Sequence, residues 1–309
     1  MNFKVYFAGG GEHWCYIAVF HNLFKKLKST YTNYTFNFVD NFSVRREGDS
    51  VNAKFGDAHM IIENLENKKY FVISYWDIIR DITNHYSVTN WDIENCVEIL
   101  ATSGTQVEER FFKQMDYPTT PISYVCMNMS CENIISKLNP DRTKAKVEKL
   151  PFRGYLYEFR KFLSEDNRFD VVDKTKNMLS VENYINEIAN VNINLSLNGA
   201  GEICNRDIEI LGTGTALFRP ELKCRFHNPL IPDYHYIAVN TSDISTDINF
   251  WKYYQILADR MYEKFKEVKD NDEYIDFVSK NGKKWYDENG TVEKNAEIIL
   301  NLINLDKLK

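Results

Sequence analysis

The sequence lacks the long apolar segments that would indicate a membrane protein. No run reaches the roughly eighteen consecutive apolar residues that a membrane-spanning helix needs. The first seven residues, Met1 to Phe7, read as the start of a strand that meets glycines almost at once, which is too short for a secretory signal. We therefore expect a cytoplasmic protein with no transmembrane segment.

Paired metal-binding or disulfide-forming cysteines are also missing. The six cysteines include no C-x-x-C pair and no histidine partner at zinc spacing, so we expect reduced thiols. Basic charge is in deficit as well, with a net charge of −6. A protein that binds nucleic acid along its phosphate backbone needs a basic excess, so we expect no nucleic-acid partner. A local basic pocket for a diphosphate is still compatible with this balance.

Several catalytic fingerprints are absent. Gly9, Gly10 and Gly11 follow the first strand, but Trp14 stands where a dinucleotide fingerprint needs its third glycine. There is no Walker lysine and no G-x-S-x-G nucleophile elbow. No D-x-D pair stands at an expected strand end, because Asp270 and Asp272 lie in a polar stretch that we expect to be helical. A metal-independent reaction is therefore the better interpretation, without excluding a divalent metal.

The pattern that is present alternates strands with helices. At 309 residues the chain can form two domains of about 150 residues each. Expected strands lie at 3–8, 34–39, 58–62, 70–74, 97–100 and 122–126, then at 147–152, 169–172, 191–197, 215–218 and 236–239. Expected helices lie at 14–28, 155–164, 181–190 and 205–211, and from 247 onward most of the chain reads as helical. Such alternation predicts parallel, Rossmann-like layers, and a polar linker at 137–149 suggests domains at 1–140 and 141–309.

The segment from Asn192 to Pro220 carries the most information. An apolar strand runs into a turn that contains Gly199 and Gly201, where backbone can approach a ligand closely. A helix is expected to open near Asn205 and to be closed by Gly212 and Gly214. The free N–H groups at the start of such a helix form an anion site, so the pattern is typical of phosphate binding.

This segment resembles the C-terminal domain of GT-B glycosyltransferases. Glu209 to Thr215 is similar to that superfamily's E-A-x-x-x-G motif, although Ile210 replaces the small residue. The spacing from Arg206 to Gly214 is similar to the capsule-associated and protein O-glucosyl/xylosyltransferase-like group, although Cys204 replaces its serine. The resemblance implies an α/β fold with two Rossmann-like domains facing across a cleft, and a Glu209 that holds ribose hydroxyls. It covers 147–305 moderately well, and 1–130 only in architecture.

The same resemblance marks further residues of the donor site. Glu202 stands near the place of a second family glutamate, one residue out of register with it. Arg153 and Arg160 resemble the F-R-G…R entry to the domain, and a guanidinium suits a diphosphate because its planar fork binds oxygens in pairs. The expected donor-binding residues are Arg153, Arg160, Gly201, Glu202, Arg206, Glu209 and Gly214. Arg219, Lys223 and Arg225 add positive charge nearby, although charge clusters are more often solvated faces.

The resemblance implies that the C-terminal domain, 141–309, binds the nucleotide sugar and that the N-terminal domain, 1–140, is the acceptor side. The acceptor side should supply a base that takes the proton from the attacking hydroxyl. Glu12 and His13 follow the first strand and its glycines, and Asp77 follows a later strand. Ligands of α/β folds bind at the carboxyl ends of strands, so these three are the candidate catalytic residues.

The leading hypothesis is a glycosyltransferase acting on a nucleotide sugar, UDP-linked by expectation, and a glycan or other hydroxyl acceptor. We expect inversion at the anomeric carbon, a hexosyl or pentosyl group, and no required cofactor, since the nucleotide sugar is the substrate. Two alternatives stay open: a GT-B-fold sugar-nucleotide epimerase, which would need extra cleft carboxylates, and a non-catalytic nucleotide-sugar or glycan-binding protein.

Overall fold

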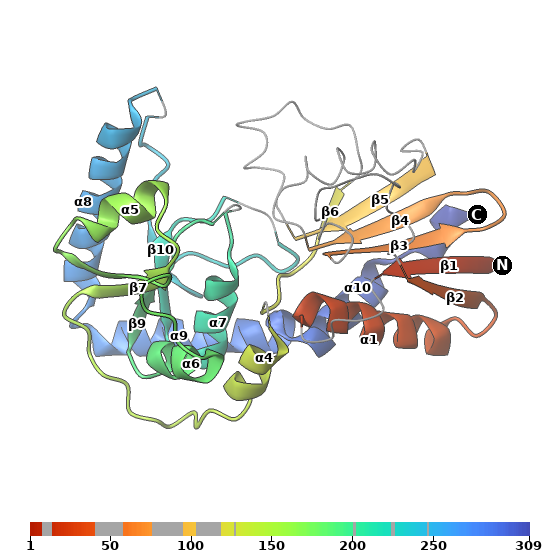
Figure 1. The fold of residues 1–309 in the computed structure, drawn as a ribbon, viewed down its shortest axis with the longest axis horizontal. Coiled ribbons are helices and arrows are strands. Elements are labelled where there is room, and N and C mark those ends of the chain that lie inside the picture. Colours follow the sequence, from red (N-terminus) through yellow and green to blue (C-terminus); the bar gives the residue numbers. More distant parts are fainter. Residues whose placement is uncertain are drawn as a thin grey trace.

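Three β-sheets organise the described parts of the chain: a six-stranded sheet in the first half, and a three-stranded and a two-stranded sheet in the second half (Figure 1). The computed structural model describes residues 1–7, 14–40, 58–75, 95–102, 119–126, 128–199, 202–223, 226–245 and 247–309. Within these ranges, each helix is either too short or too polar to cross a bilayer.

The first sheet has the strand order β2-β1-β3-β4-β5-β6. Its strands are β1 (Asn2–Phe7), β2 (Thr35–Asp40), β3 (His59–Asn64), β4 (Tyr70–Ser74), β5 (Cys96–Ala101) and β6 (Thr119–Pro121). Helix α1 (Cys15–Thr30) packs on this sheet with one apolar face, from which Phe20, Leu23 and Leu27 are fully buried.

The expected parallel order fails at β3, which is antiparallel to both β1 and β4. The turn at 65–69 is the physical reason, because a parallel connection needs a crossover of a dozen or more residues. Asn64 donates its N–H to Lys69 O at 2.9 Å and closes a hairpin instead. The apolar residues 122–126 are also not a strand. They are buried, but the β6 ladder ends at Pro121.

The three-stranded and the two-stranded sheet of the second half are both parallel, as expected. They lie side by side, and we call them together the second sheet. Its strands are β7 (Leu150–Gly154), β8 (Phe169–Asp173), β9 (Ile193–Leu195), β10 (Ala216–Pro220) and β11 (Ile237–Val239). β9, β10 and β11 are bonded in that order, β8 is bonded to β7, and β7 lies beside β9. The chain thus runs outward from β7 to β8 and then returns to the other side of β7. In α/β sheets, ligands bind at the carboxyl ends of strands beside such a reversal.

Helices cover both faces of the second sheet. They are α4 (Met129–Ile135), α5 (Glu158–Ser164), α6 (Val181–Ala189), α7 (Asn205–Thr213), α8 (Phe250–Val268) and α9 (Asp272–Trp285). One face packs with α5, α8 and α9 around Leu163, Leu257 and Phe265. Helices α6 and α7 belong to a second cluster of buried residues that continues into the first sheet.

The end of the chain returns to the first sheet. A π-helical turn (Tyr286–Gly290) leads to α10 (Val292–Leu302) and a 3₁₀ turn (Leu305–Leu308). Helix α10 lies along α1, where Glu293 pairs with Lys26 at 2.8 Å (Figure 1). Asn64 donates its side-chain amide to Leu308 O at 2.8 Å. The division of the chain near residue 140 stays a prediction, and the last helix packs with elements of the first half.

Candidate functional site

Helix α7 begins where the sequence predicts and runs two residues beyond the expected end at 211, so Gly212 lies inside it. Its N-cap is Cys204, whose N–H donates to the Asp207 carboxylate at 2.7 Å, as in a capping box. Gly214 ends the helix with a φ of 68°, a left-handed conformation that glycine adopts without a Cβ penalty. Residues 196–199 connect β9 to this helix, so the loop sits at the carboxyl end of the sheet.

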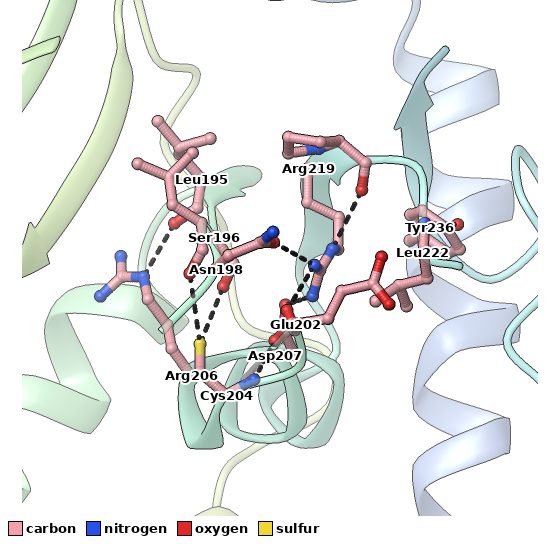
Figure 2. A network of polar contacts seen from close by, with 12 residues as sticks. Leu195, Ser196, Asn198, Glu202, Cys204, Arg206, Asp207, Arg219, Leu222 and Tyr236 are labelled. Carbon is pink, nitrogen blue, oxygen red and sulfur yellow. Dashed lines mark hydrogen bonds and ion pairs between the residues drawn. The ribbon is translucent and has the colours of Figure 1, made fainter. Parts of the chain in front are cut away.

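A buried ion pair fixes that loop (Figure 2). Arg219, from β10, pairs with Asp207, from α7, at 2.6 Å, and both side chains are fully buried. The Arg219 guanidinium also donates to Asn198 Oδ1 at 3.0 Å and to Glu202 O at 2.8 Å. Arg219 therefore positions the loop on both sides of residues 200 and 201, and its charge is already balanced by Asp207.

A pocket of about 470 Å³ opens at the carboxyl ends of β9, β10 and β11. The first turns of α5 and α8 form its other wall. Its lining residues are Tyr157, Glu158, Phe159, Arg160, Leu197, Asn198, Gly199, Glu202, Pro220, Glu221, Lys223, Thr241, Ile248, Asn249, Phe250, Tyr253, Tyr254 and Leu257. Aromatic walls with a few convergent polar groups are typical of small-molecule sites.

Arg160, one of the predicted donor-binding residues, lines this pocket. It is 8% exposed, and its guanidinium donates to Leu197 O at 2.8 Å. The rings of Phe152 and Tyr157 lie 5.1 Å and 4.7 Å from its guanidinium carbon. Its Nε is buried without a hydrogen-bond partner. A buried cation that retains an unused donor at a pocket wall suits an anionic ligand.

Glu202 and Lys223 also line the pocket, but the Glu202 carboxylate already accepts a hydrogen bond from a backbone N–H. Its Oε1 accepts from the Lys223 N–H at 2.7 Å, and its own carbonyl accepts from Arg219. These bonds hold the loop after β9 against the segment after β10. The structure thus gives Glu202 a role in shaping the pocket wall.

Arg206 and Glu209 form a separate polar cluster beside the pocket. Tyr184, from α6, donates its hydroxyl to Glu209 Oε2 at 2.8 Å. Burial raises the pKa of the Glu209 carboxyl, while the Tyr184 hydroxyl, the Arg206 charge and the Cys131 thiol act in the opposite direction. Glu209 is 6% exposed and is not among the residues that line the pocket described above.

Arg206 is held by backbone carbonyls. It donates to Leu195 O at 2.8 Å and to Arg153 O at 3.1 Å. The Phe152 ring lies 5.1 Å from its guanidinium carbon, the same distance as from that of Arg160. Phe152 therefore contacts both guanidinium groups, Arg160 in the pocket wall and Arg206 in the Glu209 cluster. Arg153 instead forms a bidentate ion pair with Glu187, with nitrogen–oxygen distances of 2.8 and 2.7 Å.

The described residues leave part of the predicted site untested. Glu12, His13 and Asp77, the candidate bases, lie outside the described residues, as do Gly201 and Arg225. Asp270 lies in the turn before α9, Asn271 is the N-cap of that helix, and Asp272 is its first residue. Asp272 accepts from Lys146 at 2.6 Å.

Four contributors were missed by reasoning from the sequence: Tyr157, Asn198, Tyr184 and Asp207. Tyr157 and Asn198 line the pocket, and Tyr184 holds Glu209. Tyr157 is the N-cap of α5. The sequence instead predicts a helix that begins at 155, which places Tyr157 inside the helix and gives no sign that it lines a pocket. Asp207 had a readable signal, because an acid at the third position of a helix suits a capping box. Its pairing with Arg219 needed the sheet.

Comparisons with known proteins bear on the fold. No protein-family model and no curated protein matches the sequence. Among solved structures, a glycosyltransferase from Rickettsia africae ESF-5 matches with a TM-score of 0.52 at 10% identity, over 99% of this chain and 98% of that one. Sucrose-phosphate synthase from Thermosynechococcus elongatus gives 0.45 at 11% identity, over 74% of this chain. The GtfA/B complex gives 0.40 at 11%, over 71% of this chain.

The chain spans 66% of the sucrose-phosphate synthase chain and 48% of the GtfA/B chain. At such identities the likeness concerns the fold alone, and the match to the Rickettsia protein covers both sheets. The predicted fold class is confirmed: the chain is an α/β protein built from two Rossmann-like halves of the GT-B type.

Proposed function

We propose that this protein is a glycosyltransferase that moves a sugar from a nucleotide-sugar donor to a hydroxyl group of a glycan acceptor. One observation carries the proposal beyond the fold: Arg160 lines the pocket at the carboxyl ends of the parallel strands and keeps a buried, unpartnered Nε. That position suits the diphosphate of the donor, because a guanidinium binds phosphate oxygens in pairs and stays charged.

In the proposed reaction, the acceptor oxygen attacks the anomeric carbon while the bond from that carbon to the diphosphate oxygen breaks. The electron pair leaves with the nucleoside diphosphate, and a base takes the acceptor proton. Glu12, His13 and Asp77 are the candidates for the base. Arg160 would stabilise the growing negative charge from the pocket wall, where its own side chain is buried.

The Glu209 cluster would serve the ribose. In that role the Glu209 carboxylate would exchange the Tyr184 hydroxyl for a ribose hydroxyl, and the Arg206 charge would favour the ionised form against the effect of burial. The finer features remain part of the proposal: a UDP-linked donor, inversion, hexosyl or pentosyl transfer, independence of metal, a cytoplasmic location and kinship with the capsule-associated and O-glucosyl/xylosyltransferase-like group.

The test is a thermal-shift panel of UDP-, GDP-, dTDP- and CMP-linked sugars, each with and without a divalent metal. A ligand at about a hundred times its Kd stabilises the folded state by about 2.7 kcal/mol, which is readily detected. We expect one nucleotide class to stabilise the wild type without metal. Arg160→Lys keeps the charge but loses the planar fork, so it should weaken that shift.

The matched control is Arg168→Lys. Arg168 stands just before β8, at the amino edge of the same sheet, where it pairs with Asp166 at 2.6 Å. Its variant should bind the donor as the wild type does. Equal losses in both arginine variants would mean that the effect is not local to the pocket, and the absence of any nucleotide-dependent shift in the wild type would remove the proposal.

A further inference from the structure

Helix α8 exposes large aromatic side chains where it begins. Phe250 is 77% exposed and Trp251 is 69% exposed. Single exposed apolar residues are common on protein surfaces, whereas a contiguous exposed aromatic surface is typical of a binding site. Helix α5 lies beside this part of α8 (Figure 1).

The two exposed rings and three partly buried ones form one contiguous group, which we call the aromatic shelf: Phe159, Phe162, Phe250, Trp251 and Tyr254. Phe162 lies 6.1 Å from Trp251 and 5.9 Å from Tyr254 between ring centroids. Tyr254 also contacts Phe159 at 5.2 Å and Phe250 at 6.3 Å. Because each ring is supported by its neighbours, the shelf is a preformed surface rather than a set of free side chains.

The shelf is hollowed and carries charge at its edge. A depression of about 450 Å³ lies between Phe162, Phe250, Trp251 and Tyr254, and its other lining residues are Glu158, Lys161 and Glu165. Two carboxylates and one amine beside the rings provide hydrogen-bond acceptors and a donor. This lining suits a ligand that has both apolar faces and many hydroxyl groups.

The depression is continuous with the candidate donor pocket. Glu158, Phe250 and Tyr254 line both hollows. A ligand that extends out of the pocket therefore passes directly onto the shelf. This continuity favours a molecule that takes part in the reaction over an unrelated protein partner.

We propose that the aromatic shelf binds a segment of the glycan acceptor, with pyranose rings stacked on Trp251 and Phe250 and with hydroxyl groups bonded to Glu158 and Glu165. This proposal rests on the proposed glycosyltransferase function. The C–H face of a pyranose packs on an aromatic ring, while its hydroxyls need the polar partners that the rim supplies. An anionic lipid surface is a poorer match, because two of the three charged lining groups are carboxylates.

The experiment measures binding of neutral oligosaccharides by titration calorimetry, using the full chain and a panel of malto-, cello-, chito- and manno-oligosaccharides. The variants are Trp251→Ala, Phe250→Ala and Trp251→Phe. Phe277→Ala is the control, because Phe277 is also exposed, at 47%, but lies on α9. UDP-sugar binding is measured on the same samples, together with association to vesicles that contain phosphatidylglycerol.

We expect at least one oligosaccharide to bind the wild type and Phe277→Ala equally. Loss of an aromatic anchor should weaken binding about tenfold in Trp251→Ala and Phe250→Ala. Trp251→Phe should recover most of the affinity because it keeps a ring. Nucleotide-sugar binding should be unchanged in Trp251→Ala, Trp251→Phe and Phe277→Ala, because Trp251 and Phe277 do not line the donor pocket. Phe250 lines both hollows, so Phe250→Ala is compared with the wild type for oligosaccharide binding alone.

Absence of binding by every oligosaccharide overturns the shelf proposal, as does equal binding in Trp251→Ala and wild type. Binding to vesicles that is lost in the same variants, without oligosaccharide binding, also overturns it in favour of a membrane surface. If no nucleotide sugar binds the wild type, the proposed enzymatic function fails, and the oligosaccharide titrations still decide whether the shelf binds glycans.

Discussion

At the scale of single residues, Glu209 is a buried carboxyl whose pKa is shifted by its surroundings. Burial raises its pKa, and the Tyr184 hydroxyl and Arg206 oppose this without reversing it. A carboxyl with a raised pKa favours the protonated form in the folded state. Its stabilising contribution is therefore complete below the ordinary carboxyl pKa and is lost as pH rises through the folded-state value.

Glu209→Gln should accordingly gain stability over the wild type as pH rises. The glutamine is neutral at every pH, and its amide oxygen can still accept from Tyr184. Melting temperatures of both proteins between pH 4 and pH 8 measure the difference, with Glu148→Gln as control because Glu148 is 86% exposed on its side chain. A difference that shrinks with rising pH would mean that attraction to Arg206 outweighs burial.

At the Asp207–Arg219 pair, removal of the carboxylate charge should lower the stability of the protein, in contrast to Glu209. Asp207→Asn leaves the Arg219 guanidinium buried without its counter-charge, and breaking such a pair costs about 3–5 kcal/mol. Urea unfolding measures the loss. Lys146→Ala, which removes an ion pair between exposed side chains, should leave the unfolding midpoint nearly unchanged. A loss in Asp207→Asn no larger than in Lys146→Ala would contradict a structural role for the pair.

At the scale of elements, the sequence predicts most of the second half because its signals are local. The N-cap region of α7 and the glycine that ends it are chemical features of a few adjacent residues, and so is the strand before them. The antiparallel orientation of β3 also has a local cause, because the turn from β3 to β4 is too short for a crossover. The alternation of strands and helices along the chain does not reveal it.

The arrangement of the site was less predictable. Arg153, Arg160 and Arg206 look equivalent as cations in the sequence, yet Arg153 is paired with Glu187 and only Arg160 lines the pocket. Which partner a side chain meets depends on the crossing of α5, α6 and α7 over the sheet. No spacing along the chain encodes the Tyr184–Glu209 contact, because it joins two helices.

The packing of α9 depends on one glycine. A Cβ at Gly282 would stand 2.6 Å from His235 O and 2.8 Å from Leu211 Cδ2. Alanine is the better helix former by about 1 kcal/mol, but the backbone oxygen cannot move aside easily, and overpacking costs about 1–3 kcal/mol. We expect Gly282→Ala to lower the free energy of unfolding in urea.

Lys280→Ala is the control for helix propensity on α9. The Lys280 side chain is 76% exposed, so an alanine there does not press against His235 or Leu211. It should leave stability unchanged or raise it slightly. Stabilisation by both alanines would show that propensity outweighs packing at Gly282 and that α9 can shift away from α7.

At the scale of the whole molecule, one cluster of buried residues crosses between the two halves. It joins the first sheet and α1 with α6, α7 and α10. Tyr75, directly after β4, donates its buried hydroxyl to Asn295 on α10 at 2.9 Å. Because α10 follows the second sheet in the chain but packs on α1, unfolding of either half should remove packing from the other.

Calorimetry should therefore record one cooperative transition for the 309 residues, although many chains of this length unfold domain by domain. Tyr75→Phe leaves Asn295 Oδ1 without this donor, which costs about 1–3 kcal/mol in a buried site. The variant should shift the whole transition to lower temperature while keeping a single peak. Two separate peaks in the wild type, with only one displaced by Tyr75→Phe, would mean that the shared cluster does not couple the halves and that α10 stabilises the first sheet alone.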